Sequence, residues 1–339
     1  MTAGPFGVGG PAFRAPPWLP GGHAQTIWPV LGARRRRAPL LRFRRERWNT
    51  PDGDFVDADF LADEGVAGAG AASARPLLVL FHGLEGSTTS HYALSFALAA
   101  RARGWAYAVP HFRGCSGEIN RAPRAYHSGD HAEVGWMLGR LRAAHTGPLL
   151  AVGVSLGGNA LLRWAEEAGA AAADTVSALA TVCAPLDLAA SGAAMGRGFN
   201  RVVYTRLFLR TMLPKAFAKW QQYPGLFDRE RVQRARTLYD FDDAFTAPLH
   251  GFRDTDDYWA RASARPHLHR VGVPSLVLNP RNDPFVPAAS LPGVADVSPA
   301  VTLWQPAHGG HVGFPDGPAI RGQVPTLPDA VTGWLADRR

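Results

Sequence analysis

The chain has little cysteine and no long apolar run, and each shortage excludes a class of protein. Two cysteines in 339 residues cannot form a disulfide framework, so a cytoplasmic setting is expected. No stretch of about 20 apolar residues occurs, which argues against a transmembrane helix. The first residues show neither the charged nor the apolar segment of a secretory signal peptide. Hydrophobic residues nevertheless make up 46% of the chain, enough for a sizeable core.

Lysine is equally scarce. It occurs only at Lys215 and Lys219, so arginine supplies nearly all the positive charge behind the net charge of +8. The arginines are densest in one block between residues 34 and 47. Such a block is most often a solvated face, with an anionic partner as the alternative. Since no recognised nucleic-acid module accompanies it, no nucleic-acid partner is predicted. The block comprises residues 34–37 together with Arg42, Arg44, Arg45 and Arg47.

Apolar strand-like runs alternate with helix-like stretches along most of the chain. This alternation predicts an α/β fold with a mostly parallel central sheet and helices on both faces. The expected β-hairpin covers residues 41–61 and turns at 51–54. Three parts are expected: an N-terminal arm packed on the core (1–40), the α/β core (41–184 and 271–339), and a helical cap or lid insertion (185–270).

The sequence Gly-Val-Ser-Leu-Gly-Gly at 153–158 is the most informative stretch. It follows an apolar run and precedes a helix-like stretch, which is the setting of the nucleophile elbow in the α/β-hydrolase fold. Such a turn strains and exposes its serine, here Ser155. Gly153 and Gly157 suit it because side chains there would collide with neighbouring backbone. The alternative interpretation is a glycine-rich turn with an idle serine.

A serine nucleophile needs a base and an acid that orients the base. In this fold they follow the serine in the order acid, then histidine, each after a strand. Asp283 and His311 stand at such positions and are the preferred acid and base. Asp187 remains an alternative acid and His308 an alternative base.

Two backbone amides are candidates for the oxyanion hole. A strand ending in His-Gly at 82–83 is a usual place for one donor, assigned to Leu84. The residue after the nucleophile, Leu156, supplies the other. Cys115 and His23 are interpreted as packing residues. The His308/His311 pair lacks the spacing of a zinc motif, so no metal and no cofactor is predicted.

Together these motifs give the chain a resemblance to the YheT-like family of α/β-hydrolases, which includes eukaryotic abhydrolase-domain proteins. The similarity runs from about residue 18 to residue 314. The matching stretches are 22–27 (GHAQTI), 50–55 (TPDGDF), 82–86 (HGLEG), 112–117 (FRGCSG), 126–130 (YHSGD), the elbow through Asn159, 241–246 (FDDAFT), 282–284 (NDP) and 309–314 (GGHVGF).

The resemblance implies a serine esterase or lipase-type hydrolase in which Ser155 is the nucleophile, Asp283 the acid and His311 the base. The expected reaction is hydrolysis of carboxylic esters, such as short-chain esters or monoacylglycerols, through an acyl-enzyme. An acyltransferase with the same triad is the alternative enzyme, and a binding protein without turnover is a third possibility. Eukaryotic members carry an N-terminal membrane anchor that is not evident in this sequence, so a cytoplasmic protein is expected. Peripheral contact with lipid surfaces is a separate possibility, and the expected partner is a small-molecule ester.

The insertion carries one further prediction. Apolar residues recur at roughly helical spacing between 201 and 213, and Pro214 is expected to end this helix. Val202, Val203, Leu207 and Met212 are predicted to form a stripe that lines an acyl pocket. A packing subdomain without a gating role is the alternative to a lid.

Overall fold

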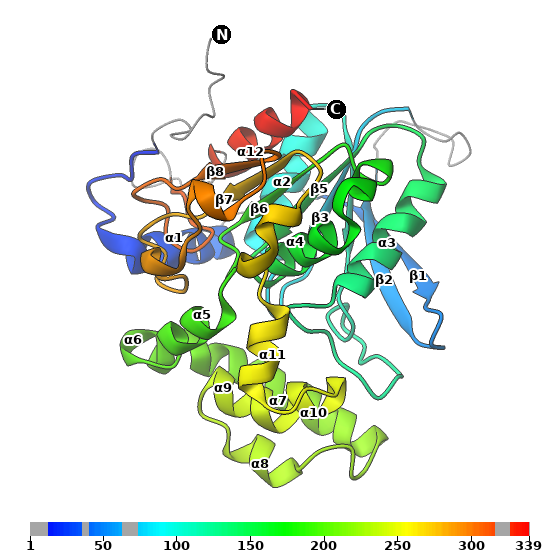
Figure 1. Cartoon of the computed structure of the whole chain (residues 1–339), viewed down its shortest axis with the longest axis vertical. Coiled ribbons are helices and arrows are strands. Elements are labelled where there is room, and N and C mark those ends of the chain that lie inside the picture. Colours follow the sequence, from blue (N-terminus) through cyan, green and yellow to red (C-terminus); the bar gives the residue numbers. More distant parts are fainter. Residues whose placement is uncertain (1–12, 36–40, 63–73, 316–325, 339) are drawn as a thin grey trace.

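The computed structural model describes residues 13–35, 41–62, 74–315 and 326–338. Its centre is a twisted eight-stranded sheet in the order β1-β2-β4-β3-β5-β6-β7-β8 (Figure 1). The hairpin strands β1 and β2 pair antiparallel with each other, and β2 pairs antiparallel with β4, whereas β4 and all later neighbours in the sheet run parallel. The strands are β1 (Phe43–Asn49), β2 (Phe55–Leu61), β3 (Leu77–Phe81), β4 (Ala106–Pro110), β5 (Leu149–Val154), β6 (Ala178–Val182), β7 (Ser275–Leu278) and β8 (Val301–Trp304).

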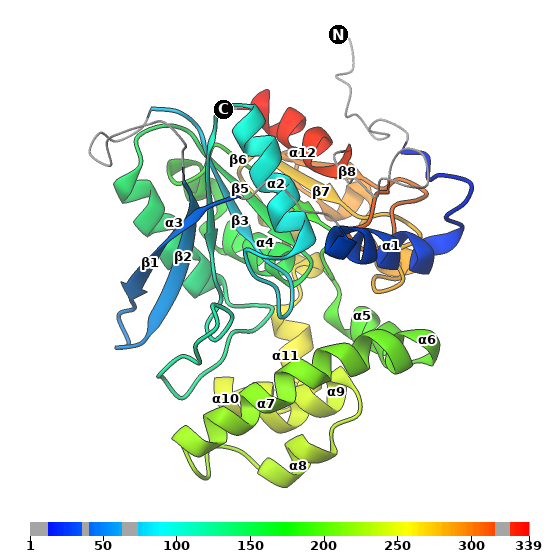
Figure 2. The ribbon, with the colours of Figure 1, turned by 180° about the vertical axis from the view of Figure 1, so that it is seen from behind.

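Helices cover both faces of the sheet (Figures 1 and 2). Successive side chains of a strand point to opposite faces, so Leu78 and Leu80 of β3 pack with α2 and α12, whereas Val79 and Phe81 pack with α3 and α4. The central strands are apolar throughout because both of their faces are buried. These helices are α2 (His91–Ala102), α3 (His131–Ala144), α4 (Leu156–Ala168) and α12 (Thr326–Ala336).

The N-terminal arm contains a helix, α1 (Gly21–Arg35), that the residue pattern did not predict. Its buried face carries Gln25 and Thr26 rather than an apolar stripe, and Pro29 lies inside the helix. A helix held by buried polar contacts shows no hydrophobic period, which is why the pattern missed it.

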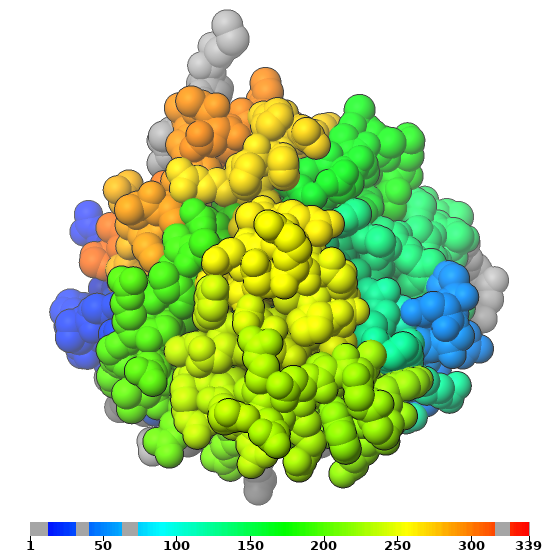
Figure 3. Space-filling model, turned by 60° about the horizontal axis from the view of Figure 1, so that its bottom comes forward, coloured from blue at the N-terminus to red at the C-terminus, as the bar shows by residue number. Residues whose placement is uncertain are grey.

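The segment between β6 and β7 forms a group of helices beyond one end of the sheet (Figure 1). Figure 3 shows the surface of this segment at that end of the molecule. Two π-helical turns, Arg201–Thr205 and Asp242–Thr246, interrupt them. Apolar side chains from α7, α9 and the second π-turn form a cluster separate from the two clusters of the core. The helices are α5 (Leu188–Met195), α6 (Gly198–Asn200), α7 (Arg206–Gln222), α8 (Arg229–Arg234), α9 (Leu238–Phe241), α10 (Ala247–His250) and α11 (Thr255–Ala262).

Two predictions for this segment are wrong. Pro214 does not end the helix but lies inside α7, on an exposed side where the loss of one backbone donor is tolerated. Val202 and Leu207 do not line a pocket, because they are 64% and 57% exposed. The π-turn at 201–205 widens the helix and changes which residues face inward.

The predicted fold class, a mostly parallel sheet with helices on both faces and a helical cap, is confirmed. Among the described residues, no helix combines the length and the apolar character needed to cross a bilayer. The parallel strands β3, β5, β7 and β8 all end on the side of the sheet that faces the cap. The candidate residues follow these carboxyl ends.

Candidate active site

Ser155 occupies a strained turn between β5 and α4. Its backbone has φ 53° and ψ −121°, a conformation that non-glycine residues rarely adopt. The Ser155 amide donates to the carbonyl oxygen of Val182 at 2.8 Å, which fixes the turn against β6. A Cβ on Gly157 would lie 2.5 Å from the carbonyl oxygen of His82, so only glycine fits there. The turn therefore presents the serine side chain at the carboxyl end of β5.

The structure brings Ser155, His311 and Asp283 into one chain of contacts. Nε2 of His311 lies 3.0 Å from Oγ of Ser155, and its Nδ1 lies 2.8 Å from Oδ2 of Asp283. The other Asp283 oxygen accepts from the Phe285 amide at 2.8 Å, and the Asp283 side chain is fully buried. The Phe285 ring stacks on the imidazole at a centroid distance of 4.1 Å. These contacts fix the plane of the imidazole between the serine and the carboxylate.

The alternative acid and base lie elsewhere. Asp187 caps the N-terminus of α5 by accepting from the Ala190 amide and lies 3.6 Å from Arg265. His308 is exposed, and its Nδ1 contacts Nδ2 of Asn282 at 3.5 Å. Neither residue contacts Ser155 or His311, so the geometry favours Asp283 and His311.

Cys115 and His23 make the packing contacts expected of them. Burial raises the pKa of the Cys115 thiol to about 12, so it stays protonated and is a poor nucleophile. Nδ1 of His23 contacts the hydroxyl of Tyr204 at 3.2 Å, and its ring packs against Phe199.

The amides of Leu84 and Leu156 are both available beside Ser155. The neighbouring Gly83 and Glu85 amides donate to the hydroxyls of Tyr92 and Tyr126, each at 2.9 Å. Within the described part of the chain, the Leu84 and Leu156 amides have no hydrogen-bond partner. Both residues line the cavity that contains Ser155 and His311. Two free donors at this place suit a developing oxyanion.

Helix α1 ties together the two loops that carry Asp283 and His311. Oε1 of Gln25 accepts from Nδ2 of Asn282 at 2.9 Å and from the Gly309 amide at 3.0 Å, and its Nε2 donates to the carbonyl of Leu19 at 3.0 Å. Oγ1 of Thr26 accepts from the amide of His311 itself at 2.8 Å. The residue pattern gave no role to Gln25 and Thr26; only the matched stretch 22–27 pointed to this helix.

Cys183 supports the same histidine loop from the end of β6. Its Sγ accepts from the Val312 amide at 3.2 Å and lies 3.7 Å from the carbonyl oxygen of Gly310. Its Sγ, a carboxylate oxygen of Asp283 and a ring nitrogen of His311 lie within 4.8 Å of one another, close enough for a metal ion. However, Nδ1 of His311 already contacts Asp283, and burial raises the pKa of the Cys183 thiol well above its ordinary value. This group is therefore better suited to orienting the imidazole than to holding a metal.

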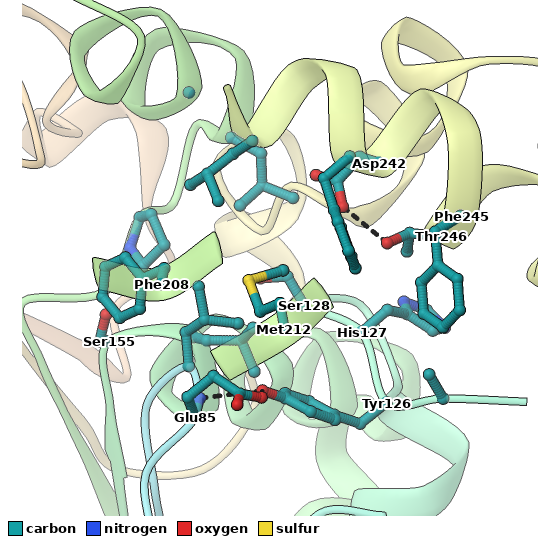
Figure 4. A pocket seen from close by; sticks show the side chains of 18 of the residues that line it. Glu85, Tyr126, His127, Ser128, Ser155, Phe208, Met212, Asp242, Phe245 and Thr246 are labelled. Atoms are coloured by element: carbon teal, nitrogen blue, oxygen red, sulfur yellow. Dashed lines mark hydrogen bonds between the residues drawn. The ribbon is translucent and has the colours of Figure 1, made fainter. Parts of the chain in front are cut away.

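A narrow cavity of about 160 Å³ leads from Ser155 between the core and the cap (Figure 4). Phe208 lies beside Ser155 in this view, with Met212 further along and Phe245 at the opposite end. Asp242 also lines that far end and accepts from Thr246 and Trp259. Burial raises the pKa of Asp242 to about 6, although both hydrogen bonds oppose the shift. Most of the surface that lines the cavity as a whole is apolar, which suits an acyl chain.

The only two lysines of the chain join the cap to the core beside this cavity. Nζ of Lys215 on α7 lies 2.9 Å from both carboxylate oxygens of Glu85, which also accepts from Tyr126. Nζ of Lys219 donates to the carbonyls of Asn120 and Ala122. Because Glu85 follows Leu84 directly, the position of α7 is linked to the loop that carries one candidate oxyanion donor.

Comparison with known proteins gives matches over nearly the whole chain. Residues 76–318 match the family model of the alpha/beta hydrolase fold. The Escherichia coli (strain K12) protein named "Putative esterase YheT" is 38% identical over 92% of this chain and 91% of its own length. The mouse protein named phospholipase ABHD3 is 30% identical over 82% of this chain and 68% of its own.

A solved structure supports the fold independently. The Pyrococcus furiosus esterase Pf2001 superposes with a TM-score of 0.53 at 14% identity and covers 88% of this chain and 93% of that one. At this identity the likeness concerns the fold alone. The family match and the identity to YheT go further and indicate a hydrolase. The chain therefore belongs to the α/β-hydrolase family and, within it, to the YheT-like group.

Proposed function

We propose that this protein hydrolyses carboxylic esters through an acyl-enzyme formed on Ser155. The observation that carries the proposal is the chain of contacts from Ser155 Oγ through His311 to Asp283 at a strained elbow. His311 accepts the serine proton as Oγ attacks the ester carbonyl, and then delivers it to the departing alcohol. Asp283 holds the proton of Nδ1 and stabilises the imidazolium.

The proposed oxyanion hole consists of the amides of Leu84 and Leu156. The carbonyl oxygen gains negative charge during attack, and fixed N–H donors stabilise that charge without reorganisation. Leu156 is the first residue of α4, so the positive end of the helix dipole adds to the effect. Water then enters along the same path and releases the acid by the reverse proton transfers.

The apolar cavity and the names of the relatives suggest the substrate class. One relative is named "Putative esterase YheT" and another "Phospholipase ABHD3", so we propose that the acyl group comes from a short-chain or lipid-like ester. The chain of this acyl group would lie along Phe208 and Met212 under the cap. The cap segment, proposed as residues 185–270, would then cover the bound acyl chain.

Labelling with a fluorophosphonate and turnover of p-nitrophenyl esters test this proposal. Wild type should react with the label, whereas Ser155→Ala should not, and its hydrolysis should fall at least about 10³-fold. His311→Ala and Asp283→Asn should also lose most activity. His308→Ala and Asp187→Asn are matched controls that should keep it. Equal labelling of wild type and Ser155→Ala would overturn the assignment, and ester products formed with added alcohols would indicate an acyltransferase.

A further inference from the structure

The N-terminal part of the cap exposes large apolar side chains to solvent. Phe199, Val202 and Leu207 are 49%, 64% and 57% exposed, although they follow one another within three helical turns. The sequence predicted that Val202 and Leu207 would line the acyl pocket. Isolated apolar residues are common on surfaces, whereas a group of them in one short stretch is typical of an interaction site.

The opposite side of the same segment explains why these residues face outward. Tyr204 and Leu209 are buried, and Phe208 and Met212 line the cavity that leads to Ser155. The π-turn at 201–205 sets this register. The segment therefore carries apolar side chains on its outer side as well as on its inner side.

The outer side is also strongly cationic. Four arginines are exposed there, and none of them forms an ion pair with a described residue; they are Arg197, Arg201, Arg206 and Arg210. No aspartate or glutamate occurs between residues 188 and 227. Elsewhere on the cap, Arg231, Arg253 and Arg261 each pair with an aspartate. The local excess of positive charge is thus a property of this segment and not of the whole cap.

Helix α1 lies next to this segment. Its His23 packs against Phe199 at a ring distance of 4.6 Å, so the two elements are neighbours. In Figure 2, α1 lies above α5 and α6. Val30 and Leu31 of α1 are exposed as well. We call the exposed residues Phe199, Val202, Leu207 and the four arginines the cap face.

We propose that the cap face docks on the surface of an anionic phospholipid bilayer. Exposed apolar side chains interleaved with arginines are the pattern of interfacial helices, in which the apolar groups enter the acyl boundary and the cations contact anionic headgroups. A second copy of the chain fits less well, because a two-fold contact would set four arginines against four arginines. A nucleic acid would use the arginines but would leave the three apolar side chains in water.

Docking in this way would bring the cavity close to the lipid. Phe208 follows Leu207 directly and lines the cavity with Met212, so one helix carries both the docking residues and the proposed acyl contacts. This link rests on the proposed ester hydrolysis, whereas the docking itself does not. Bilayer-resident esters would then be hydrolysed faster on anionic vesicles than on neutral ones, while water-soluble esters would be unaffected.

Vesicle sedimentation tests the docking with charge-neutral variants. The triple variant Phe199→Ser, Val202→Ser, Leu207→Ser keeps the net charge and should bind phosphatidylglycerol-containing vesicles at least about tenfold more weakly than wild type. Val294 is 67% exposed on the core, so Val294→Ser is a matched control that should bind like wild type. Arg201→Gln should also weaken binding, and Arg101→Gln, which removes the same charge from an exposed position of α2, should weaken it less.

A fluorescent label locates the contact. Both native cysteines are buried, so Leu207→Cys can be labelled selectively with an environment-sensitive dye. Its emission should shift to shorter wavelength on phosphatidylglycerol vesicles and stay unchanged on phosphatidylcholine vesicles. The midpoint of thermal unfolding serves as the check of folding for every variant and should match wild type.

Three results would overturn the proposal. Wild-type binding by the triple variant would mean that only the general positive charge attracts the protein to vesicles. Concentration-dependent dimerisation without lipid, abolished by the triple variant, would make a second copy the occupant. Binding of DNA that competes with vesicles and does not depend on the three apolar residues would make the face a site for nucleic acid. If no ester is hydrolysed but vesicle binding follows the pattern above, the proposed function fails and the docking stands.

Discussion

Replacing Gln25 by methionine should damage catalysis although Gln25 touches no substrate. The side chain is 1% exposed and makes three hydrogen bonds, which join α1 to the loops of Asp283 and His311. Methionine has a similar length but cannot make any of these bonds. The Asn282 side chain, the Gly309 amide and the Leu19 carbonyl would each lose a partner.

The magnitude follows from these three bonds. A buried hydrogen bond contributes about 1 kcal/mol net, so Gln25→Met should lower the free energy of unfolding by about 3 kcal/mol. Gly309 lies two residues before His311, so the imidazole would shift relative to Ser155. A misplacement of about 1 Å can cost about 10²-fold in rate, and we expect kcat to fall between about 10-fold and 100-fold with little change in KM.

The assay combines urea unfolding with steady-state kinetics on a soluble ester. Tyr107→Phe is the matched control, because it removes a buried hydrogen bond to the Ala93 carbonyl that involves neither the loop of Asp283 nor the loop of His311. It should lower stability and leave kcat unchanged. Wild-type kcat for Gln25→Met at a temperature where the variant is folded would refute a positioning role, as would a loss of kcat equal to the fraction of unfolded protein.

The remaining predictions concern the cap, the cavity and pH. Lys215→Met should lower kcat about tenfold, because it leaves Glu85 without its cation beside the oxyanion loop; the double variant with Glu85→Gln should recover part of the loss in kinetic assays. Met212→Asp should flatten the rise of kcat/KM with acyl length, worth about 0.8 kcal/mol per buried methylene, whereas the exposed Leu207→Asp should leave soluble-ester profiles intact. Burial opposes ionisation of Asp54, but its hydrogen bonds prevail and lower its pKa to about 2 from 3.8. The stability that its ionised form contributes should be complete above about pH 4 and be lost as the pH falls to about 2, so Asp54→Asn should flatten this part of the urea-unfolding profile; an unchanged slope would contradict it.

Much of the core could be predicted because its signals are local. A continuous apolar run such as residues 77–81 identifies a strand buried on both faces, and the elbow sequence identifies the turn that follows β5. Asp283 and His311 could be proposed as acid and base because the order of residues in this fold is known and each follows a strand.

The parts held by long-range polar contacts could not be predicted. Helix α1 is fixed by Gln25 and Thr26, whose partners lie more than 250 residues away in the chain. A hydrophobic period cannot reveal such a helix. The apolar spacing of residues 201–213 did predict a helix, but not the π-turn that directs Val202 and Leu207 to the outside. Spacing alone gives a periodicity and leaves open which side of the helix is buried.

Trapping of the acyl-enzyme tests the proposed mechanism most directly. Wild-type protein quenched in acid during turnover of a p-nitrophenyl ester should carry the acyl mass on the peptide that contains Ser155. His311→Ala should accumulate little adduct, because the serine is not activated, and Ser155→Ala should carry none. An acyl adduct on another residue such as Cys115, or undiminished hydrolysis by Ser155→Ala, would contradict it.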